Sequence, residues 1–249
     1  DGKSTTTAWL GAICAVEHRT WVGSNIGIPL CEAVDRLTPE HVVVAEISCF
    51  QLTNSAELHP TVALFTNLAP DHLDYYSGSI EAYYGAKKRL MANLVSGDTA
   101  VLNRDDPVLR TWNAPGEAAT LWYSMQPLAD DLPGVFVRDG EIMERLDGIG
   151  GTLLPVEQLP LPGEHNVENA MAAALGARAF GVSAEAVRRG LCEFDGLEHR
   201  IERVATVDGV TWYNDSKATN VASTRSALES LDRPVVLLDR KSTRLNSSH

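Results

Sequence analysis

The chain has 249 residues, of which 44% are hydrophobic and 22% charged, a composition ordinary for one large globular domain or for a domain with part of a second. Its net charge of -12 argues against a nucleic-acid binder, because such a protein needs Lys and Arg to neutralise phosphates. The sequence has no apolar run of the roughly 20 residues that span a membrane and no C-x-x-C spacing among its four cysteines, so we expect a cytoplasmic protein with free thiols and no membrane insertion.

The first residues match the end of a phosphate-binding loop. The segment DGKST at 1–5 runs into an apolar segment at 8–10, as a G-x-x-x-x-G-K-[ST] loop runs into its helix. In such a loop Lys3 reaches the β- and γ-phosphates, the Ser4 hydroxyl binds Mg²⁺, and the N–H groups of the first helical turn face the phosphates. The strand and first glycine of the motif would lie before residue 1. The alternative is an ordinary helix start capped by Ser and Thr.

Short apolar segments alternate with helical patterns through the first half of the chain. We expect strands at 20–22, 42–45, 62–65 and 100–102, and helices at 6–16, 28–37 and 79–94. Apolar strands separated by helices are typical of βαβ units in a parallel sheet that is buried on both faces. Ligands of such sheets bind at the carboxyl ends of the strands.

Polar side chains follow two of these strands. Glu46 comes directly after the strand at 42–45, and Asp71, His72 and Asp74 follow the strand at 62–65. Carboxylates and an imidazole at the sheet edge that also holds a phosphate loop are suited to Mg²⁺. The alternatives are a solvated strand-end glutamate and a structural histidine. Lys87, on the helix at 79–94, is by its residue type alone an ordinary surface lysine.

The second half has a different pattern. Segments 135–138 and 141–143 flank an Asp-Gly dipeptide suited to a tight hairpin turn, which predicts a small antiparallel annex. The next elements expected are a helix at 166–180, a helix from a Ser183 cap to Leu191, strands at 201–207, 210–213 and 235–238, and a helix at about 223–231. Asn166 and Asn169, three residues apart on one helix face, are placed either to hold a base or ribose or to cap the helix.

These patterns together predict an α/β fold with a P-loop-type, mostly parallel sheet flanked by helices, a small antiparallel annex, and the start of a Rossmann-like C-terminal domain. We expect a central nucleotide-binding domain at 1–197 and the start of the second domain at 198–238. The basic, polar tail at 239–249 has no core periodicity, so we expect it to be disordered or foreign to the natural protein.

Eight motifs occur together in the order seen in the Mur ligases. They are Gly2-Lys3-Ser4-Thr5, Asn25-Ile26-Gly27, EISCFQL at 46–52, the run from Asn67 to Asp74, Ala86-Lys87, Gly163-Glu164-His165-Asn166, His199-Arg200 and DSKATN at 215–220. The sequence from 1 to about 238 therefore resembles this family, and its EISCFQL and DSKATN segments resemble those of the member that adds D-glutamate. It departs from the family at Cys49, where a second Ser is usual. The family's N-terminal domain and most of its C-terminal domain would lie outside residues 1–238, so we expect this form not to ligate.

The resemblance implies an enzyme that joins D-glutamate to UDP-N-acetylmuramoyl-L-alanine in peptidoglycan precursor synthesis. It would use ATP and two Mg²⁺ ions, pass through an acyl phosphate and act as a monomer. The implied nucleotide ligands are Gly2, Lys3, Ser4, Thr5, Asn166, Asn169, Arg200 and Asp215, the implied substrate ligands are Asn25, Ser48, Gln51, Lys217 and Thr219, and the implied metal ligands are Ser4, Glu46, His72 and Lys87, the last as a carbamate.

The residues implied to act in the chemistry itself are Lys3, His72, Lys87 and Lys217. The resemblance also implies that Asn166 and Asn169 bind the adenine side of ATP. Three alternatives stay open: another Mur ligase, an amide ligase similar to folylpolyglutamate synthetase, and a nucleotide-binding remnant without chemistry.

Overall fold

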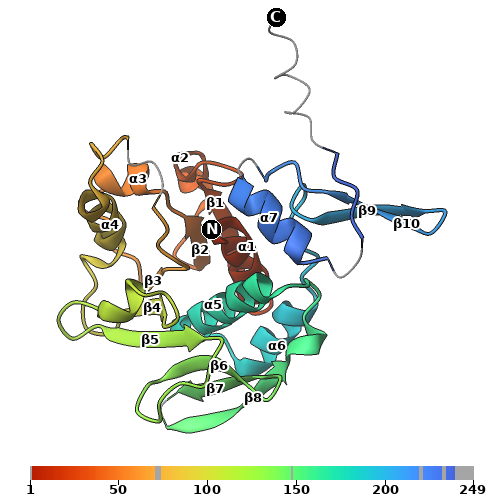
Figure 1. Cartoon of the computed structure of the whole chain (residues 1–249). Coiled ribbons are helices and arrows are strands. Elements are labelled where there is room, and N and C mark those ends of the chain that lie inside the picture. The colour runs from red at the N-terminus through yellow and green to blue at the C-terminus, as the bar shows by residue number, and fades with distance from the viewer. Residues whose placement is uncertain (1, 71–73, 147, 219–220, 232–233, 239–249) are drawn as a thin grey trace, which may run out of the picture. The chain divides into compact units, whose positions relative to one another are not determined.

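The computed structural model describes residues 2–70, 74–146, 148–218, 221–231 and 234–238 (Figure 1). The chain divides into two compact units, residues 1–197 and 198–249. The helices are α1 (Lys3–Cys14), α2 (Leu30–Ala33), α3 (Cys49–Thr53), α4 (Ile80–Lys88), α5 (Glu164–Phe180), α6 (Ala184–Cys192) and α7 (Val221–Glu229). The strands are β1 (Arg19–Ser24), β2 (His41–Glu46), β3 (Val62–Leu64), β4 (Thr99–Asn103), β5 (Ala119–Ser124), β6 (Gly134–Arg138), β7 (Glu141–Leu146), β8 (Ile149–Pro155), β9 (Glu202–Val207) and β10 (Val210–Asn214).

The first unit has a six-stranded sheet in the order β3-β4-β5-β6-β7-β8 and a separate parallel pair, β1-β2. Strands β3 to β6 pair in parallel, and β7 and β8 add antiparallel pairings at one end. The α/β class, the mostly parallel arrangement and the antiparallel annex at the Asp-Gly turn are confirmed. A single parallel sheet through all the early strands is wrong, because β2 and β3 share no ladder in the described chain and β2 packs against α1 instead.

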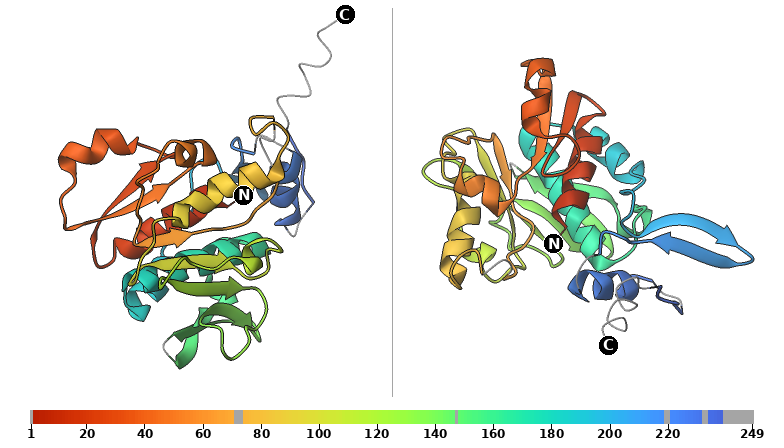
Figure 2. Two further views of the ribbon diagram at one scale, coloured as in Figure 1. Left: turned by 90° about the vertical axis from the view of Figure 1, so that its left-hand side faces the viewer. Right: turned by 90° about the horizontal axis from the view of Figure 1, so that it is seen from above.

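Helix α5 is the centre of the first unit. It contacts α1 and α6 on one side and strands β3 to β6 on the other (Figures 1 and 2). Its middle carries mainly small apolar residues that are fully buried, from Ala170 to Ala177. Small side chains let neighbouring elements approach closely, as at Gly190 on α6, where a Cβ atom would lie 2.6 Å from the Ile13 Cα. The opposite face of the six-stranded sheet is covered by a second core that includes Phe65, Leu109 and Trp112.

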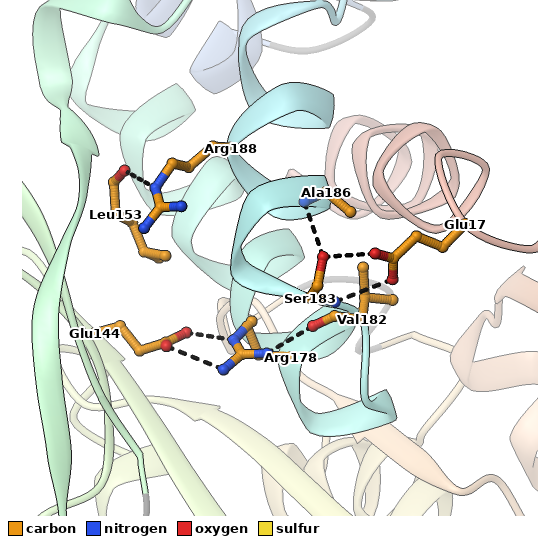
Figure 3. Close-up of polar contacts among 8 residues, drawn as sticks. All are labelled: Glu17, Glu144, Leu153, Arg178, Val182, Ser183, Ala186 and Arg188. Atoms are coloured by element: carbon orange, nitrogen blue, oxygen red, sulfur yellow. Dashed lines mark hydrogen bonds and ion pairs between the residues drawn. The ribbon is translucent and has the colours of Figure 1, made fainter.

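Charged side chains tie the C-terminal end of α5 to its neighbours (Figure 3). Arg178 forms a two-point ion pair with Glu144 of β7, with Nε–Oε2 and Nη2–Oε1 distances of 2.6 and 3.2 Å, and donates to the Val182 carbonyl at 2.7 Å. Ser183 caps α6 by accepting from the Ala186 N–H, as the sequence predicts. The Glu17 carboxylate, just beyond α1, accepts from both the hydroxyl and the N–H of Ser183 at 2.5 and 3.1 Å.

Several elements differ from the sequence-based expectation. The expected helix at 28–37 is only α2 followed by a 3₁₀ turn at Val34–Arg36, because Pro29 delays the helix start. The expected strand at 235–238 is absent, since no described strand lies beside it to accept its hydrogen bonds, and Val236 and Leu238 are largely exposed. Strands β5 and β8 and helix α3 were not anticipated. The four cysteines are free thiols, as expected.

The second unit contains the β9–β10 hairpin and α7. The hairpin turns at an Asp-Gly dipeptide, as predicted, and its register shifts between Trp212 and Tyr213. Its apolar side chains are exposed to a similar degree on both strands, including Val204, Val210 and Trp212. None of the helices in the described ranges is long and apolar enough to cross a membrane.

Candidate functional site

The start of α1 has the geometry of an anion-binding helix terminus. Gly2 precedes the helix with a φ of 83°, and the first helical hydrogen bond runs from the Thr6 N–H to the Gly2 carbonyl at 2.9 Å. The described residues provide no side-chain cap and no acidic group in the first turn, so the alternative of a Ser- or Thr-capped helix is wrong. The N–H groups of Lys3, Ser4 and Thr5 therefore have no intrahelical acceptor and suit a phosphate.

A second group of site residues gathers where β1 and β2 end. We name Asn25, Glu46, Ser48 and Gln51 the strand-end cluster. The Asn25 side chain donates to Glu46 Oε1 at 2.7 Å, and the backbones of the same two residues bond at 3.0 Å. Gln51 accepts from the Ser48 N–H at 2.8 Å and donates to Ser24 Oγ at 3.2 Å. The structure thus brings together three of the five residues expected to bind substrate and one expected metal ligand.

Glu46 is unusual within this cluster because its carboxylate is buried and only half satisfied. The residue is 4% exposed, and its Oε2 atom has no hydrogen-bond partner among the described residues. A buried carboxylate oxygen without a donor is costly unless a cation or another donor completes its environment. Carboxylate and hydroxyl oxygens are the ligands that Mg²⁺ prefers, so Glu46 fits the metal expected near Ser4. Within the described ranges, no group of three His, Cys, Asp or Glu side chains is placed to hold a metal ion.

Helix α3 and helix α4 are joined by aromatic contacts. Ser48 begins α3 with a capping box to Gln51, which explains why a short helix forms directly after β2. Ring pairs with centroid separations of 4.8, 5.0 and 5.4 Å run from Phe50 through Tyr75 and Tyr76 to Tyr83 on α4. The Lys87 amine lies 4.6 Å from the Tyr83 ring centroid. This aromatic chain therefore links the strand-end cluster to the lysine expected to act as a carbamate.

The first turns of α5 carry the two asparagines expected on the adenine side. Asn166 and Asn169 are both 6% exposed and both hydrogen-bonded within the protein. Between them, burial raises the pKa of the Glu168 carboxyl, and the nearby charges of Asp105 and Glu164 raise it further. Burial and the two neighbouring charges thus both disfavour the charged form of Glu168, while Asn166 and Asn169 are neutral amides.

Three residues that we did not anticipate hold the segment after β3. Asn103 donates to the Thr66 carbonyl at 3.0 Å, the Tyr123 hydroxyl donates to the same carbonyl at 2.8 Å, and Asp106 accepts from the Leu68 N–H at 2.7 Å. These side chains fix the backbone that leads toward residues 71–74. The polar run N-R-D-D at 103–106, directly after an apolar strand, was a visible signal for two of them.

The remaining candidates in the described chain belong to the second unit. Asp215 accepts from the Ile201 N–H at 3.2 Å, and the Lys217 N–H donates to the His199 carbonyl at 3.2 Å. The Nε atom of Arg200 is buried and donates no hydrogen bond to a described residue. Its neighbours His199 and Ile201 have φ values of 66° and 47°, which are strained for non-glycine residues and for a β-branched residue above all. Arg200 is thus held on a tight, strained turn.

Two expected site residues, His72 and Thr219, lie outside the residues that the structure describes, as does the expected tail at 239–249. The roles expected for the described candidates stay predictions. What the structure establishes is their local geometry: an uncapped start of α1, the strand-end cluster, and the buried asparagines of α5.

Comparison with known proteins identifies the family. The Mur ligase middle domain matches residues 1–177. Proteins named UDP-N-acetylmuramoylalanine--D-glutamate ligase from Acidobacterium capsulatum and Pelotomaculum thermopropionicum are each 41% identical to this chain, over 241 and 239 residues. Each match covers 96% of this chain and 52% of the relative. The chain therefore spans about half the length of the curated relatives it matches.

Solved structures agree with this assignment at the level of the fold. MurF from Acinetobacter baumannii superposes with a TM-score of 0.72 at 22% identity, over 93% of this chain and 51% of that one. MurF from Thermotoga maritima, in complex with ADP, gives a TM-score of 0.66 at 18% identity, over 93% of this chain and 55% of that one. Since the middle-domain match covers residues 1–177 of 249, the chain belongs to the Mur ligase family.

Proposed function

We propose that the chain is the ATP-binding part of a ligase that adds D-glutamate to UDP-N-acetylmuramoyl-L-alanine in peptidoglycan precursor synthesis. Family membership supports the reaction type, and the names of the relatives at about 41% identity support the substrates. The enzyme would be a cytoplasmic monomer. The observation that carries the proposal is Glu46, whose buried carboxylate has one oxygen bound to Asn25 and one without a partner among described residues.

The chemical difficulty of this reaction is that its three substrates are all anions. ATP must phosphorylate a carboxylate, and the amine of D-glutamate must then attack the acyl phosphate and release phosphate. Lys3 would offset charge on the β- and γ-phosphates while the N–H groups at the start of α1 hold them in place. Asn25, Ser48 and Gln51 would orient the substrate carboxylate for attack on the γ-phosphate.

Two metal sites would complete this arrangement. Ser4 and Glu46 would hold one Mg²⁺, and His72 with a carbamylated Lys87 would hold the second. A bound Mg²⁺ supplies positive charge that stabilises the transferring phosphoryl group. From the second unit, Arg200 would contact phosphate and Asp215 the ribose, while Lys217 and Thr219 would lie toward D-glutamate.

Phosphate release tests the proposal directly. In a chain extended at both ends to the length of its relatives, we expect release from ATP that requires both UDP-N-acetylmuramoyl-L-alanine and D-glutamate. Glu46→Gln should lower that rate by on the order of a hundredfold, because it removes the charge at the metal site. Glu40→Gln is the matched control, since that carboxylate lies exposed in an ion pair with Arg19. Release with a different amino acid would indicate another Mur ligase, and ATP binding without release would indicate a remnant.

The carbamate role of Lys87 has its own test in the same extended chain. Lys87→Ala should severely depress the rate, and acetate should partly restore it by taking the place of the lost anion. Lys88→Ala is a close control, because Lys88 is the adjacent residue and also lies over an aromatic ring, 5.3 Å from the Trp112 centroid. Equal, mild effects of the two substitutions would contradict the carbamate role and indicate that Lys87 is an ordinary helix lysine in contact with Tyr83.

A further inference from the structure

A continuous chain of buried side-chain hydrogen bonds connects the start of α5 to the start of α1. The Thr6 hydroxyl bonds to Asn169 Oδ1 at 3.1 Å, Asn169 Nδ2 bonds to Asn166 Oδ1 at 3.4 Å, and Asn166 Nδ2 bonds to the Pro162 carbonyl at 2.7 Å. We call Thr6, Asn169 and Asn166 the α1–α5 hydrogen-bond network. All three residues are at least nine-tenths buried.

The Pro162 carbonyl, the last acceptor of the α1–α5 hydrogen-bond network, sets the orientation of each side chain in it. A backbone carbonyl only accepts, so Asn166 must turn its NH₂ group toward Pro162 and its oxygen toward Asn169. Asn169 must then donate to that oxygen, which leaves its own Oδ1 atom facing α1. The Thr6 hydroxyl is therefore the donor in its bond to Asn169. Both amides thus use their oxygen and an N–H within the protein.

Asn169 Oδ1 contacts both ends of the first turn of α1. On one side it accepts from Thr6, whose N–H closes that turn by bonding to the Gly2 carbonyl. On the other side it lies 2.2 Å from the position that a Cβ atom on Gly2 would occupy. One side-chain oxygen therefore contacts the residues that begin and close the turn from which phosphate-binding N–H groups project.

We propose that Thr6 and Asn169 are positioning residues for the phosphate site and fix the first turn of α1. This inference rests on the proposed nucleotide site at α1. It adds a second role to the sequence-based expectation, which gave Asn169 the adenine side. If Asn169 only reads the base, its loss leaves the binding of a base-free polyphosphate unchanged. If it positions the turn, ATP and a base-free polyphosphate weaken together.

The test compares Mg²⁺-ATP with Mg²⁺-tripolyphosphate by calorimetry in the extended chain. We expect Thr6→Val, which keeps the shape but loses the donor, to weaken both probes by the same factor of roughly five. Thr6→Ser restores the donor and should restore both affinities. Thr7→Val is the matched control on the adjacent, partly exposed position and should bind both probes as the parent does. Asn169→Ala should weaken both probes, because the positioning role does not depend on the base.

Two outcomes overturn the positioning role. One is unchanged tripolyphosphate binding by Thr6→Val, and the other is an Asn169→Ala variant that weakens ATP alone. If the parent protein binds neither probe, the proposed nucleotide site is wrong. Amide hydrogen exchange then tests the positioning role without a ligand. Thr6→Val should then speed exchange of the backbone amides at positions 6 and 7 but not of those at 11–14 in the last turn of α1. Unchanged exchange in the first turn would contradict the positioning role.

Discussion

The two ends of α5 are held by opposite kinds of interaction. The C-terminal end uses charge, with Arg178 paired to Glu144 at 2.6 Å and the following Ser183 bound to the Glu17 carboxylate. The N-terminal end uses the neutral amides of Asn166 and Asn169. Charges at the C-terminal end find fixed partners inside the protein. The amides of Asn166 and Asn169 are neutral, so they hold the N-terminal end without adding negative charge beside a bound phosphate.

The largest expected effect comes from breaking the charged end. Arg178→Ala should lower the free energy of unfolding by about 3 kcal/mol, because it leaves the largely buried Glu144 without its cation. Chemical denaturation of the 249-residue chain measures this. Arg189→Ala is the control, because its i,i+4 pair with Glu193 is exposed and should contribute less than about 1 kcal/mol. Similar losses for the two variants would show that the Arg178 pair is no more important than a surface pair.

The next effect concerns the neutral end. Gly2→Ala should weaken Mg²⁺-ATP binding by about tenfold or more, since alanine is strained at a φ of 83° and its Cβ would collide with Asn169 Oδ1. Calorimetry in the extended chain measures the affinity. Gly97→Ala is a matched control, with a φ of 95° and, apart from its chain neighbours, no atom of the described residues within 4 Å of the Cβ that alanine would add. That control should lose some stability but no affinity, and equal affinities for all three proteins would refute the close fit at Gly2.

The polar residues at the N-terminal end of α5 could be predicted from the sequence, whereas the ion pair at its C-terminal end could not. The G-E-H-N-V-E-N run placed Asn166 and Asn169 on one helix face, because local spacing alone decides that. The bond from Thr6 to Asn169 spans 163 positions in the chain, and the pair of Arg178 with Glu144 depends on where the antiparallel annex packs. Such contacts follow from tertiary packing, which single-sequence patterns do not specify.

Sheet architecture shows the same limit. The segments of β1, β2, β3 and β4 read correctly as strands because each is a short apolar run, but their division into two sheets depends on pairing partners. The segment at 235–238 has an equally apolar run and forms no strand among the described residues. The strand-end cluster could be anticipated, since residues after parallel strands share an edge. That Glu46 Oε2 has no partner among the described residues could be found only in the structure.

A smaller effect is expected at the cap that follows α5. Ser183→Ala should lower the free energy of unfolding by about 1 kcal/mol, because it removes the cap of α6 and one donor to Glu17. Denaturation of the 249-residue chain measures the loss. Ser79→Ala at the start of α4 removes a comparable cap and is the reference. A Ser183→Ala loss no larger than that of Ser79→Ala would mean that the bond to Glu17 adds nothing beyond the cap.

The smallest expected effect is the pH dependence of that same cap. The Ser183 hydroxyl, and then its N–H, lower the pKa of Glu17 from its usual value of 4.5. A lowered carboxyl pKa stabilises the folded state above the unfolded pKa, and this contribution is lost as the pH falls through the folded value. The stability cost of Ser183→Ala should therefore shrink as the pH is lowered from about 6 to about 3. In a Glu17→Gln background the cost should stay constant over that range, because no carboxylate remains to be protonated. A cost that is the same at both pH values with Glu17 present would show that Ser183 acts only as a helix cap.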